Sequence, residues 1–212
     1  MRSPPSPSSL SRAFAFAFAL AAAAFGCTKT DPAPIASPPT AASSPSPGAT
    51  TPMTDLYAFS AVPLVGGDPI SLSRYKGDVL LVVNVAAHCG YTPQYRPLGE
   101  LDRRYGPKGF HVLGFVSDEF GHQAGSVDEI KACSLDNKAS FEQFAQIHVK
   151  KGPEQHPLFA WLTSQPAFPG DVGWNFNKWL IGKKGELVAR WPSGVEPDGD
   201  VIRAAVEKAL GG

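Results

Sequence analysis

The feature that most constrains the fold is a pair of apolar runs with a helical pattern between them. The runs are VLLVVNVA at 79–86 and FHVLGFVS at 110–117. A continuous apolar run of this length is typical of a strand that is buried on both faces of a sheet. Leu98, Leu101 and Tyr105 recur on one face of the segment between them, which predicts an amphipathic helix. This strand–helix–strand order calls for a right-handed parallel crossover.

Shorter patterns complete an α/β domain. Leu56–Val62 alternates as a strand does, and Ser126 with Glu129 forms a capping-box pattern that predicts a helix start. The other expected elements are a short helix at 156–165, a hairpin at 177–191 joined by GKKG, and an amphipathic helix at 198–210. These elements together predict a central mixed sheet with helices on both faces.

The N-terminal segment has the pattern of an export signal. Arg2 and Arg12 supply positive charge, and the apolar run AFAFAFALAAAAFG follows at 13–26. An ordinary membrane-spanning helix needs roughly 20 apolar residues, so this run is too short for one. Cys27 comes next, and AFGC resembles a bacterial lipobox, although Ala24 stands where leucine is usual. We expect residues 1–27 to be a signal peptide with a lipidated Cys27, or else to be cleaved nearby in the ordinary way.

Residues 28–53 are mostly Ala, Pro, Ser and Thr, which predicts a flexible tether rather than packed structure. The folded domain is then expected at 54–212, a normal size for one domain. The formal net charge is zero and no basic stripe is present, so we expect no nucleic-acid partner. The predicted location is the periplasmic side of a bacterial cell envelope, where the N-terminal anchor is the only membrane contact.

A single cysteine, Cys89, stands between the first apolar run and the predicted helix. Four roles are open to it: a buried inert side chain, half of a disulfide, a metal ligand or a nucleophile. Thr92 suits the N-cap and Pro93 the first position of the helix that follows. Catalytic groups favour the carboxyl ends of buried parallel strands, and a helix N-terminus favours a thiolate. Position alone therefore points to a nucleophile and leaves the inert cysteine open.

Several motifs, in register, resemble the glutathione peroxidases, which are thiol peroxidases of the thioredoxin fold. They are VLLVVNVAAHCGYTPQY, KGFHVLGF, GSVDEI, HPLFAWL and WNFNKWLIGKKGELVARW. The resemblance extends over Asp55 to Leu210 without a large gap. It implies a thioredoxin-like α/β fold with a central mixed β-sheet and helices on both faces. It also implies a peroxidase that reduces hydrogen peroxide or organic and lipid hydroperoxides in response to oxidative stress.

The resemblance places the family's catalytic residues at Cys89, Gln123, Trp174 and Asn175. Cys89 matches the peroxidatic position, Gln123 lies in DEFGHQAGS, and the WNF motif supplies the other two. A thiolate attacks one peroxide oxygen, and N–H donors stabilise first the thiolate and then the leaving oxygen. Each residue also has a structural alternative: Trp174 as a packing residue, Asn175 as a turn residue and Gln123 as a loop amide.

The loop around Gln123 departs from the family pattern FPCNQFG. Ser117 replaces a common cysteine, and Asp118 and Glu119 replace neutral amides. One residue is also missing after Gln123. Carboxylates that faced the site would oppose thiolate formation and repel anionic substrates.

Cys133 lies where the thioredoxin-dependent branch of the family carries a resolving cysteine. The resemblance implies a Cys89–Cys133 disulfide during turnover, which a thioredoxin-like protein reduces; such disulfides require the helix to unravel. Glutathione is the less favoured reductant because the protein is predicted to be exported. Cys133 as a buried helix residue remains the alternative.

Other features bear on cofactors and assembly. We expect no cofactor and no metal, because His122, His148 and His156 lack ligand spacing. His88 precedes Cys89 on an extended chain, so the two side chains should point to opposite faces. The segment TSQPAFPGDVG is short, which resembles the monomeric branch of the family. Two other functions stay open: a redox relay or sensor that oxidises a partner thiol, and a non-catalytic lipoprotein that binds a partner.

Overall fold

The computed structural model describes residues 55–211. The predicted signal peptide at 1–27, the lipidation site Cys27 and the linker at 28–53 lie outside the described residues and stay predictions. Within the described part of the chain, no helix is both long enough and apolar enough to cross a membrane.

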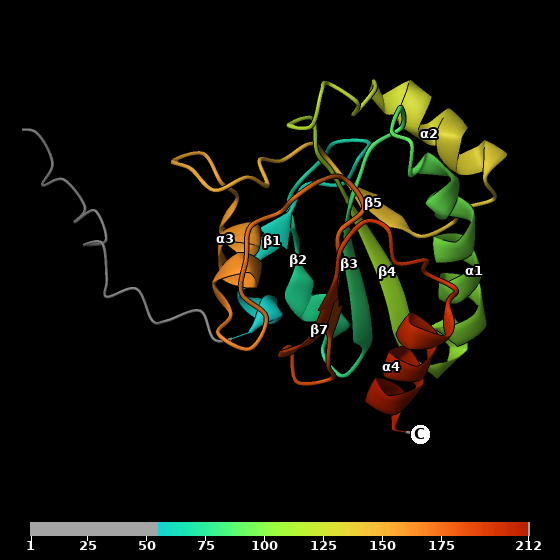
Figure 1. Ribbon diagram of the computed structural model, residues 1–212, viewed down its shortest axis with the longest axis vertical. Helices are drawn as coiled ribbons and strands as arrows, with labels where there is room; N and C mark the ends of the chain where they lie inside the picture. Colours follow the sequence, from blue (N-terminus) through green and yellow to red (C-terminus); the bar gives the residue numbers. More distant parts are fainter. Residues whose placement is uncertain (1–54, 212) are drawn as a thin grey trace, which may run out of the picture. The chain divides into compact units, whose positions relative to one another are not determined.

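A five-stranded mixed sheet forms the centre of the domain, in the order β5-β4-β3-β6-β7 (Figure 1). The pairs β3–β4 and β4–β5 are parallel, whereas β3–β6 and β6–β7 are antiparallel. The strands are β3 (Val79–Val85), β4 (Phe110–Val116), β5 (Glu142–Phe144), β6 (Lys178–Ile181) and β7 (Leu187–Trp191). The helices are α1 (Tyr95–Tyr105), α2 (Val127–Asp136), α3 (Pro157–Ser164) and α4 (Asp200–Leu210). This is the predicted thioredoxin-like architecture.

The two apolar runs form the parallel pair β3–β4, as predicted, and α1 carries the crossover between them. The register places Val79 opposite Phe110 and Val85 opposite Val116. Every residue of β3 is buried, because the strand has a neighbour on each edge and a packed layer on each face. Since the two strands run in the same direction, the loops that leave Val85 and Val116 start at the same edge of the sheet.

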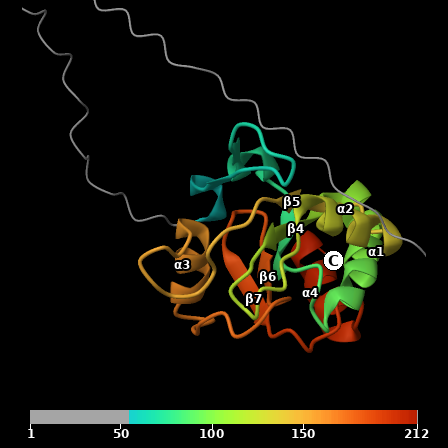
Figure 2. The same cartoon turned by 90° about the horizontal axis from the view of Figure 1, so that it is seen from above.

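Alternate residues of β3 point to opposite faces of the sheet and lie in two separate apolar layers. Leu81 and Val83 pack with side chains of α1 and α4, and Leu80 and Val82 pack with α3 and with side chains of residues 56–75. Figure 2 shows α3 on one side of the sheet and α1 and α4 on the other. Each fully buried Val or Leu contributes about 1.5–3 kcal/mol, so burial stabilises β3, the strand from which the Cys89 turn starts.

The prediction of a strand at Leu56–Val62 was wrong for most of its length. Asp55 accepts a hydrogen bond from the Tyr57 N–H and caps the 3₁₀ helix η1 (Leu56–Ala58). The paired strand of this stretch is limited to β1 (Ser60–Ala61), which pairs with β2 (Ile70–Ser71). A local cap therefore overrides the alternating pattern. β5 was not among the predicted elements, because its three residues are too few to show a period.

The predicted helix starts were confirmed in one case and displaced in another. Ser126 and Glu129 form both hydrogen bonds of a capping box at the start of α2. Thr92 is not an N-cap: it begins the 3₁₀ helix η3 (Thr92–Gln94), which leads into α1. Pro97 then lies in the first turn of α1. A backbone N–H there would have no partner within the helix, so proline costs no helical hydrogen bond.

Candidate active site

Cys89 lies in the turn between β3 and η3, at the carboxyl end of the central strand. Its side chain is buried, and the Tyr91 N–H donates to Cys89 Sγ at 3.5 Å. The Thr92 hydroxyl holds this turn, since Oγ1 accepts from the Cys89 N–H at 3.0 Å and donates to the Ala86 carbonyl at 3.1 Å. These hydrogen bonds fix the turn that carries the Cys89 sulfur and direct one backbone N–H at it.

Gln123 lies in the loop after β4, and backbone hydrogen bonds join this loop to the chain before Cys89. The His88 N–H donates to the Gln123 carbonyl at 3.0 Å, and the Ala87 N–H donates to the Ala124 carbonyl at 3.0 Å. The parallel pairing of β3 and β4 makes this possible, because it delivers both loops to one edge. Gln123 and Cys89 are thus on adjoining backbone segments.

Trp174 and Asn175 lie in the loop before β6, which is held to β3. Asn175 is fully buried, and its Nδ2 donates to Gln123 Oε1 at 3.2 Å. The Trp174 carbonyl accepts from Asn84 Nδ2 at 3.0 Å. Phe176 has a left-handed φ of 63°, an uncommon conformation for a non-glycine residue, and its N–H donates to the Asn84 carbonyl. The fold therefore brings Gln123 and Asn175 into direct contact.

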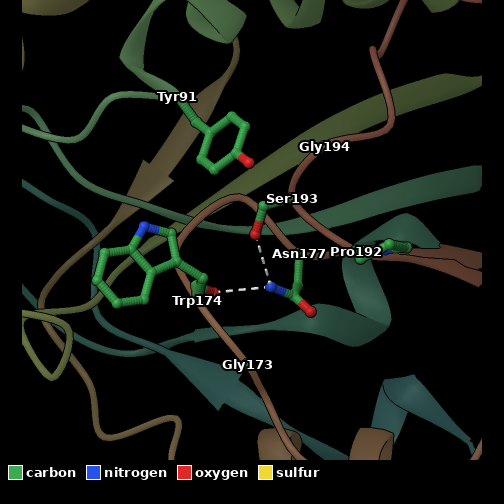
Figure 3. A pocket seen from close by; sticks show the side chains of 7 residues that line it. All are labelled: Tyr91, Gly173, Trp174, Asn177, Pro192, Ser193 and Gly194. Atoms are coloured by element: carbon green, nitrogen blue, oxygen red, sulfur yellow. Dashed lines mark hydrogen bonds between the residues drawn. The ribbon is translucent and has the colours of Figure 1, made fainter.

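A pocket of about 420 Å³ lies beside this cluster. Figure 3 shows the Trp174 indole and the Tyr91 ring on its border, together with Asn177 and Ser193. Asn177 Nδ2 donates to the Trp174 carbonyl at 2.8 Å and to Ser193 Oγ at 3.1 Å, which fixes one wall. Trp174 is 41% exposed, and its ring centroid lies 5.5 Å from that of Phe120. Its indole is thus packed against the Gln123 loop and still reaches solvent.

The two unusual carboxylates of the Gln123 loop bond to backbone donors. Asp118 Oδ1 accepts from the Ala124 N–H at 2.9 Å, and Oδ2 lies 3.0 Å from His122 Nδ1. The Ala124 hydrogen bond, then the one from His122, lowers the pKa of Asp118 below its ordinary value. Glu119 accepts from the N–H groups of Val149 and Lys150. These carboxylates shape the loop that carries Gln123.

Cys133 lies on α2 and packs, partly buried, against the same apolar cluster that contains Cys89. Both cysteines are free thiols. Burial, with a smaller effect of Asp136, raises the pKa of Cys133, and a hydrogen bond from Asn137 opposes this. Cys133 is therefore held in its protonated, less nucleophilic form.

His88 and His156 make contacts at the starts of helices. His88 Nε2 lies 3.3 Å from Glu129 Oε1, so its side chain is directed to the start of α2. His156 caps α3 by accepting from the Leu158 N–H. Among residues 55–211, no group of three or more His, Cys, Asp or Glu side chains could hold a metal ion.

The predicted site residues did not include two buried polar residues, Asn84 and Ser117, and Ser117 was noted only as a departure from the family pattern. Both are fully buried, and Asn84 Nδ2 donates to Ser117 Oγ at 3.3 Å. The signal for Asn84 was present in the sequence: it is the one amide in the apolar run 79–86. A polar side chain in such a strand must find hydrogen-bond partners inside the protein.

The fold and the buried cysteine at the end of its central strand define a thioredoxin-fold thiol oxidoreductase. Within that class, the chain belongs to the glutathione peroxidase family, whose family model, described as "Glutathione peroxidase", matches residues 56–163. It is accordingly a glutathione peroxidase-like thiol peroxidase that reduces hydroperoxides.

Individual proteins support this assignment. The "Hydroperoxy fatty acid reductase gpx1" of Synechocystis sp. is 42% identical over 73% of this chain and 95% of its own length. The "Thioredoxin/glutathione peroxidase BtuE" of Escherichia coli is 31% identical over 74% of this chain and 99% of its own length. Among solved structures, the apo form of Trgpx is similar with a TM-score of 0.59 and 34% identity, over 74% of this chain and 96% of that one.

Proposed function

We propose that Cys89 is the peroxidatic cysteine and that Gln123, Trp174 and Asn175 form its site. The observation that supports this most is the convergence of three loops at the end of β3. One of them directs the Tyr91 N–H at Cys89 Sγ, and the other two contribute the Gln123–Asn175 pair. In this arrangement, Gln123 and Trp174 supply N–H donors, and Asn175 holds Gln123.

The reaction begins when the Cys89 thiolate attacks one peroxide oxygen. An S–O bond forms while the O–O bond breaks, and the other oxygen leaves as alkoxide or hydroxide. That oxygen takes up a proton to become alcohol or water, and Cys89 is oxidised to a sulfenic acid. N–H donors around the sulfur stabilise the leaving oxygen as its charge develops.

The pocket beside Trp174 suits the organic part of a hydroperoxide. It adjoins the Cys89 turn through Tyr91, whose N–H contacts Cys89 Sγ and whose ring borders the pocket. Pro192 and the Trp174 indole add apolar surface there. We therefore include organic and lipid hydroperoxides as substrates, together with hydrogen peroxide. A relative named as a hydroperoxy fatty acid reductase supports this range.

Cys133 is the proposed resolving cysteine. Its thiolate attacks the Cys89 sulfenic sulfur, an S–S bond forms, and the hydroxyl leaves as water after it takes up a proton. Only Ile130 and Ser134 are buried among the ten residues of α2, so this helix can unwind without exposing much apolar surface. Unwinding would also relieve the burial that raises the pKa of Cys133.

The proposed reductant is a thioredoxin-like dithiol protein, which becomes a disulfide as it returns both cysteines to thiols. A relative named as a thioredoxin/glutathione peroxidase supports a dithiol donor. We further propose that the protein acts as a monomer on the periplasmic side of the cell envelope, anchored through Cys27. The motif AFGC after the apolar run 13–26 motivates that location. Labelled fatty acid incorporation that survived Cys27→Ser would contradict the anchor.

Mass spectrometry of the reduced protein after one equivalent of peroxide tests the cycle. We expect a Cys89–Cys133 disulfide, and peroxide-dependent NADPH oxidation with thioredoxin and its reductase. Cys89→Ser should abolish both signals, and Cys133→Ser should leave Cys89 as sulfenic or sulfinic acid. A wild-type protein that keeps a free Cys133 while Cys89 is oxidised would refute the two-cysteine cycle.

A further inference from the structure

We infer that Ser117 is a positioning residue: its hydroxyl, held by Asn84, orients the Gln123 amide through Asn175. This inference rests on the proposed role of Gln123 as a donor at the Cys89 site. It is carried by a continuous series of hydrogen bonds that links the centre of β3 to the Gln123 side chain, referred to below as the Asn84–Gln123 relay.

The relay starts at an amide whose orientation the backbone dictates. Asn84 Oδ1 accepts from the Asn177 N–H at 2.9 Å, and Asn84 Nδ2 donates to the Trp174 carbonyl at 3.0 Å. A backbone N–H can only donate and a carbonyl can only accept. Reversing the Asn84 amide would place two donors together and two acceptors together. Its Nδ2 therefore faces Ser117.

The direction of the Ser117 hydroxyl follows from that starting point. Asn84 Nδ2 donates to Ser117 Oγ at 3.3 Å, and Ser117 Oγ donates to Asn175 Oδ1 at 2.9 Å. Asn84 donates to the hydroxyl oxygen, and Asn175 Oδ1 is the acceptor that the hydroxyl proton finds. The reverse orientation of the Asn175 amide would leave this buried proton without an acceptor. A hydroxyl can perform both functions at once, which an apolar side chain of similar size cannot.

The orientation of the Asn175 amide in turn determines the orientation of the Gln123 amide. With Oδ1 bound to Ser117, Asn175 directs Nδ2 to Gln123 Oε1 at 3.2 Å. Gln123 must then present its Nε2 as the free donor of the amide. Asn84, Ser117 and Asn175 are all fully buried, so bulk water does not compete for these hydrogen bonds. The relay thus selects the amide orientation in which Gln123 offers an N–H to sulfur or to the leaving oxygen.

Variants of Ser117 test the two functions of its hydroxyl. A thiol is a weaker hydrogen-bond donor than a hydroxyl. Ser117→Ala removes both the donor and the acceptor, whereas Ser117→Cys keeps a weak donor. We expect the effects of these variants to rank as alanine, then cysteine, then wild type.

The test measures kcat/KM for peroxide with excess thioredoxin system in the full-length protein. Ser117→Ala should lower kcat/KM by about 10- to 100-fold, by analogy with the loss seen when a residue that orients a metal ligand is removed. Ser117→Cys should recover part of the loss. Thr163→Ala is the matched control, because Thr163 Oγ1 donates to the Phe159 carbonyl at 2.7 Å within α3, away from the relay. It should behave as wild type.

A second readout isolates the orienting effect from packing. In a Cys133→Ser background, the pH dependence of Cys89 alkylation by iodoacetamide reports its thiolate fraction. Ser117→Ala should move the alkylation midpoint to higher pH. Gln123→Ala should do the same, and adding Ser117→Ala to Gln123→Ala should produce no further change. Such non-additivity is the signature of two residues that act through one group.

The outcomes separate the inference from the function on which it rests. If Gln123→Ala slows the reaction but Ser117→Ala equals wild type, the relay is refuted and the proposed site stands. If Gln123→Ala has no effect, the proposed role of Gln123 fails and the relay with it. Equal losses from Ser117→Ala in both backgrounds would mean a purely structural role. If Ser117→Ala does not fold, Ser117→Cys carries the same cycle.

Discussion

Lys178 offers the sharpest test of how burial and charge act in this fold. It lies on β6 and is fully buried, and its Nζ donates to the carbonyls of Ser193 at 2.9 Å and Val195 at 2.7 Å. Burial lowers its pKa to about 8, an effect that Glu196 partly offsets. The ammonium therefore holds the 193–195 segment, part of which borders the pocket in Figure 3, while paying a cost of desolvation.

The pKa gives the size and the sign of the effect. Below pH 8, Lys178 is protonated in both the folded and the unfolded protein. Between about 8 and the ordinary value of 10.5, the folded protein has lost this proton while the unfolded chain still binds it. The free energy of unfolding therefore rises with pH across this window. The gap between the two pKa values corresponds to about 3 kcal/mol in total.

The perturbation is Lys178→Met, and the assay is urea unfolding of both proteins from pH 7 to pH 10.5. The difference in unfolding free energy, wild type minus variant, should grow by about 3 kcal/mol across that range. Taking the difference between the two proteins cancels the contribution of tyrosine and cysteine titration, because these residues titrate in both. A difference that stays constant with pH would refute the reasoning, because Lys178 would then keep its ordinary pKa in the interior.

Three further predictions concern the site and its support. The lowered pKa of Asp118 means that its stabilising contribution is present above about pH 4 and is lost as pH falls through the lowered value. Tryptophan fluorescence should therefore show an acid transition that Asp118→Asn removes; identical titrations would contradict this. Trp174→Phe keeps an aromatic ring beside Phe120 but loses the indole N–H, so kcat/KM should fall about 100-fold, the loss typical of one charge-stabilising donor. Unchanged kcat/KM would exclude that donor. Gly99→Ala would place Cβ 2.8 Å from Ala139 Cα and 3.0 Å from the Lys138 carbonyl oxygen, so it should lower the free energy of unfolding by about 1–3 kcal/mol. A urea midpoint equal to that of wild type would show that this backbone can move aside.

The centre of the fold could be predicted because a strand that is buried on both faces is encoded by a continuous run of apolar residues. The runs 79–86 and 110–117 became β3 (Val79–Val85) and β4 (Phe110–Val116). The prediction of a strand at Leu56–Val62 was wrong because Asp55 caps a local turn, which an alternating pattern does not reveal. β5 is defined by its pairing with β4 on one side and with Val62–Leu64 on the other, and no short-range pattern predicts either pairing.

Part of the candidate site could likewise be predicted from the sequence, and part could not. The position of Cys89 at a strand end followed from the sequence, and the family resemblance indicated Gln123, Trp174 and Asn175. The relay could not be predicted, because Asn84 and Ser117 are 33 residues apart and Ser117 and Asn175 are 58 apart. Hydrogen bonds over such separations depend on strand register, which only the folded structure provides.

The contrast between β3 and α2 has a consequence for the timing of local motions. Amides of β3 are buried between neighbouring strands, so their hydrogen exchange requires global unfolding. Amides of α2 are expected to exchange through local opening, since Leu135 is 78% exposed and few side chains anchor the helix. Cys89 thus follows a strand that is expected to exchange slowly, and Cys133 lies on a helix that is expected to exchange fast. Low concentrations of denaturant should therefore speed disulfide formation before they slow the attack on peroxide.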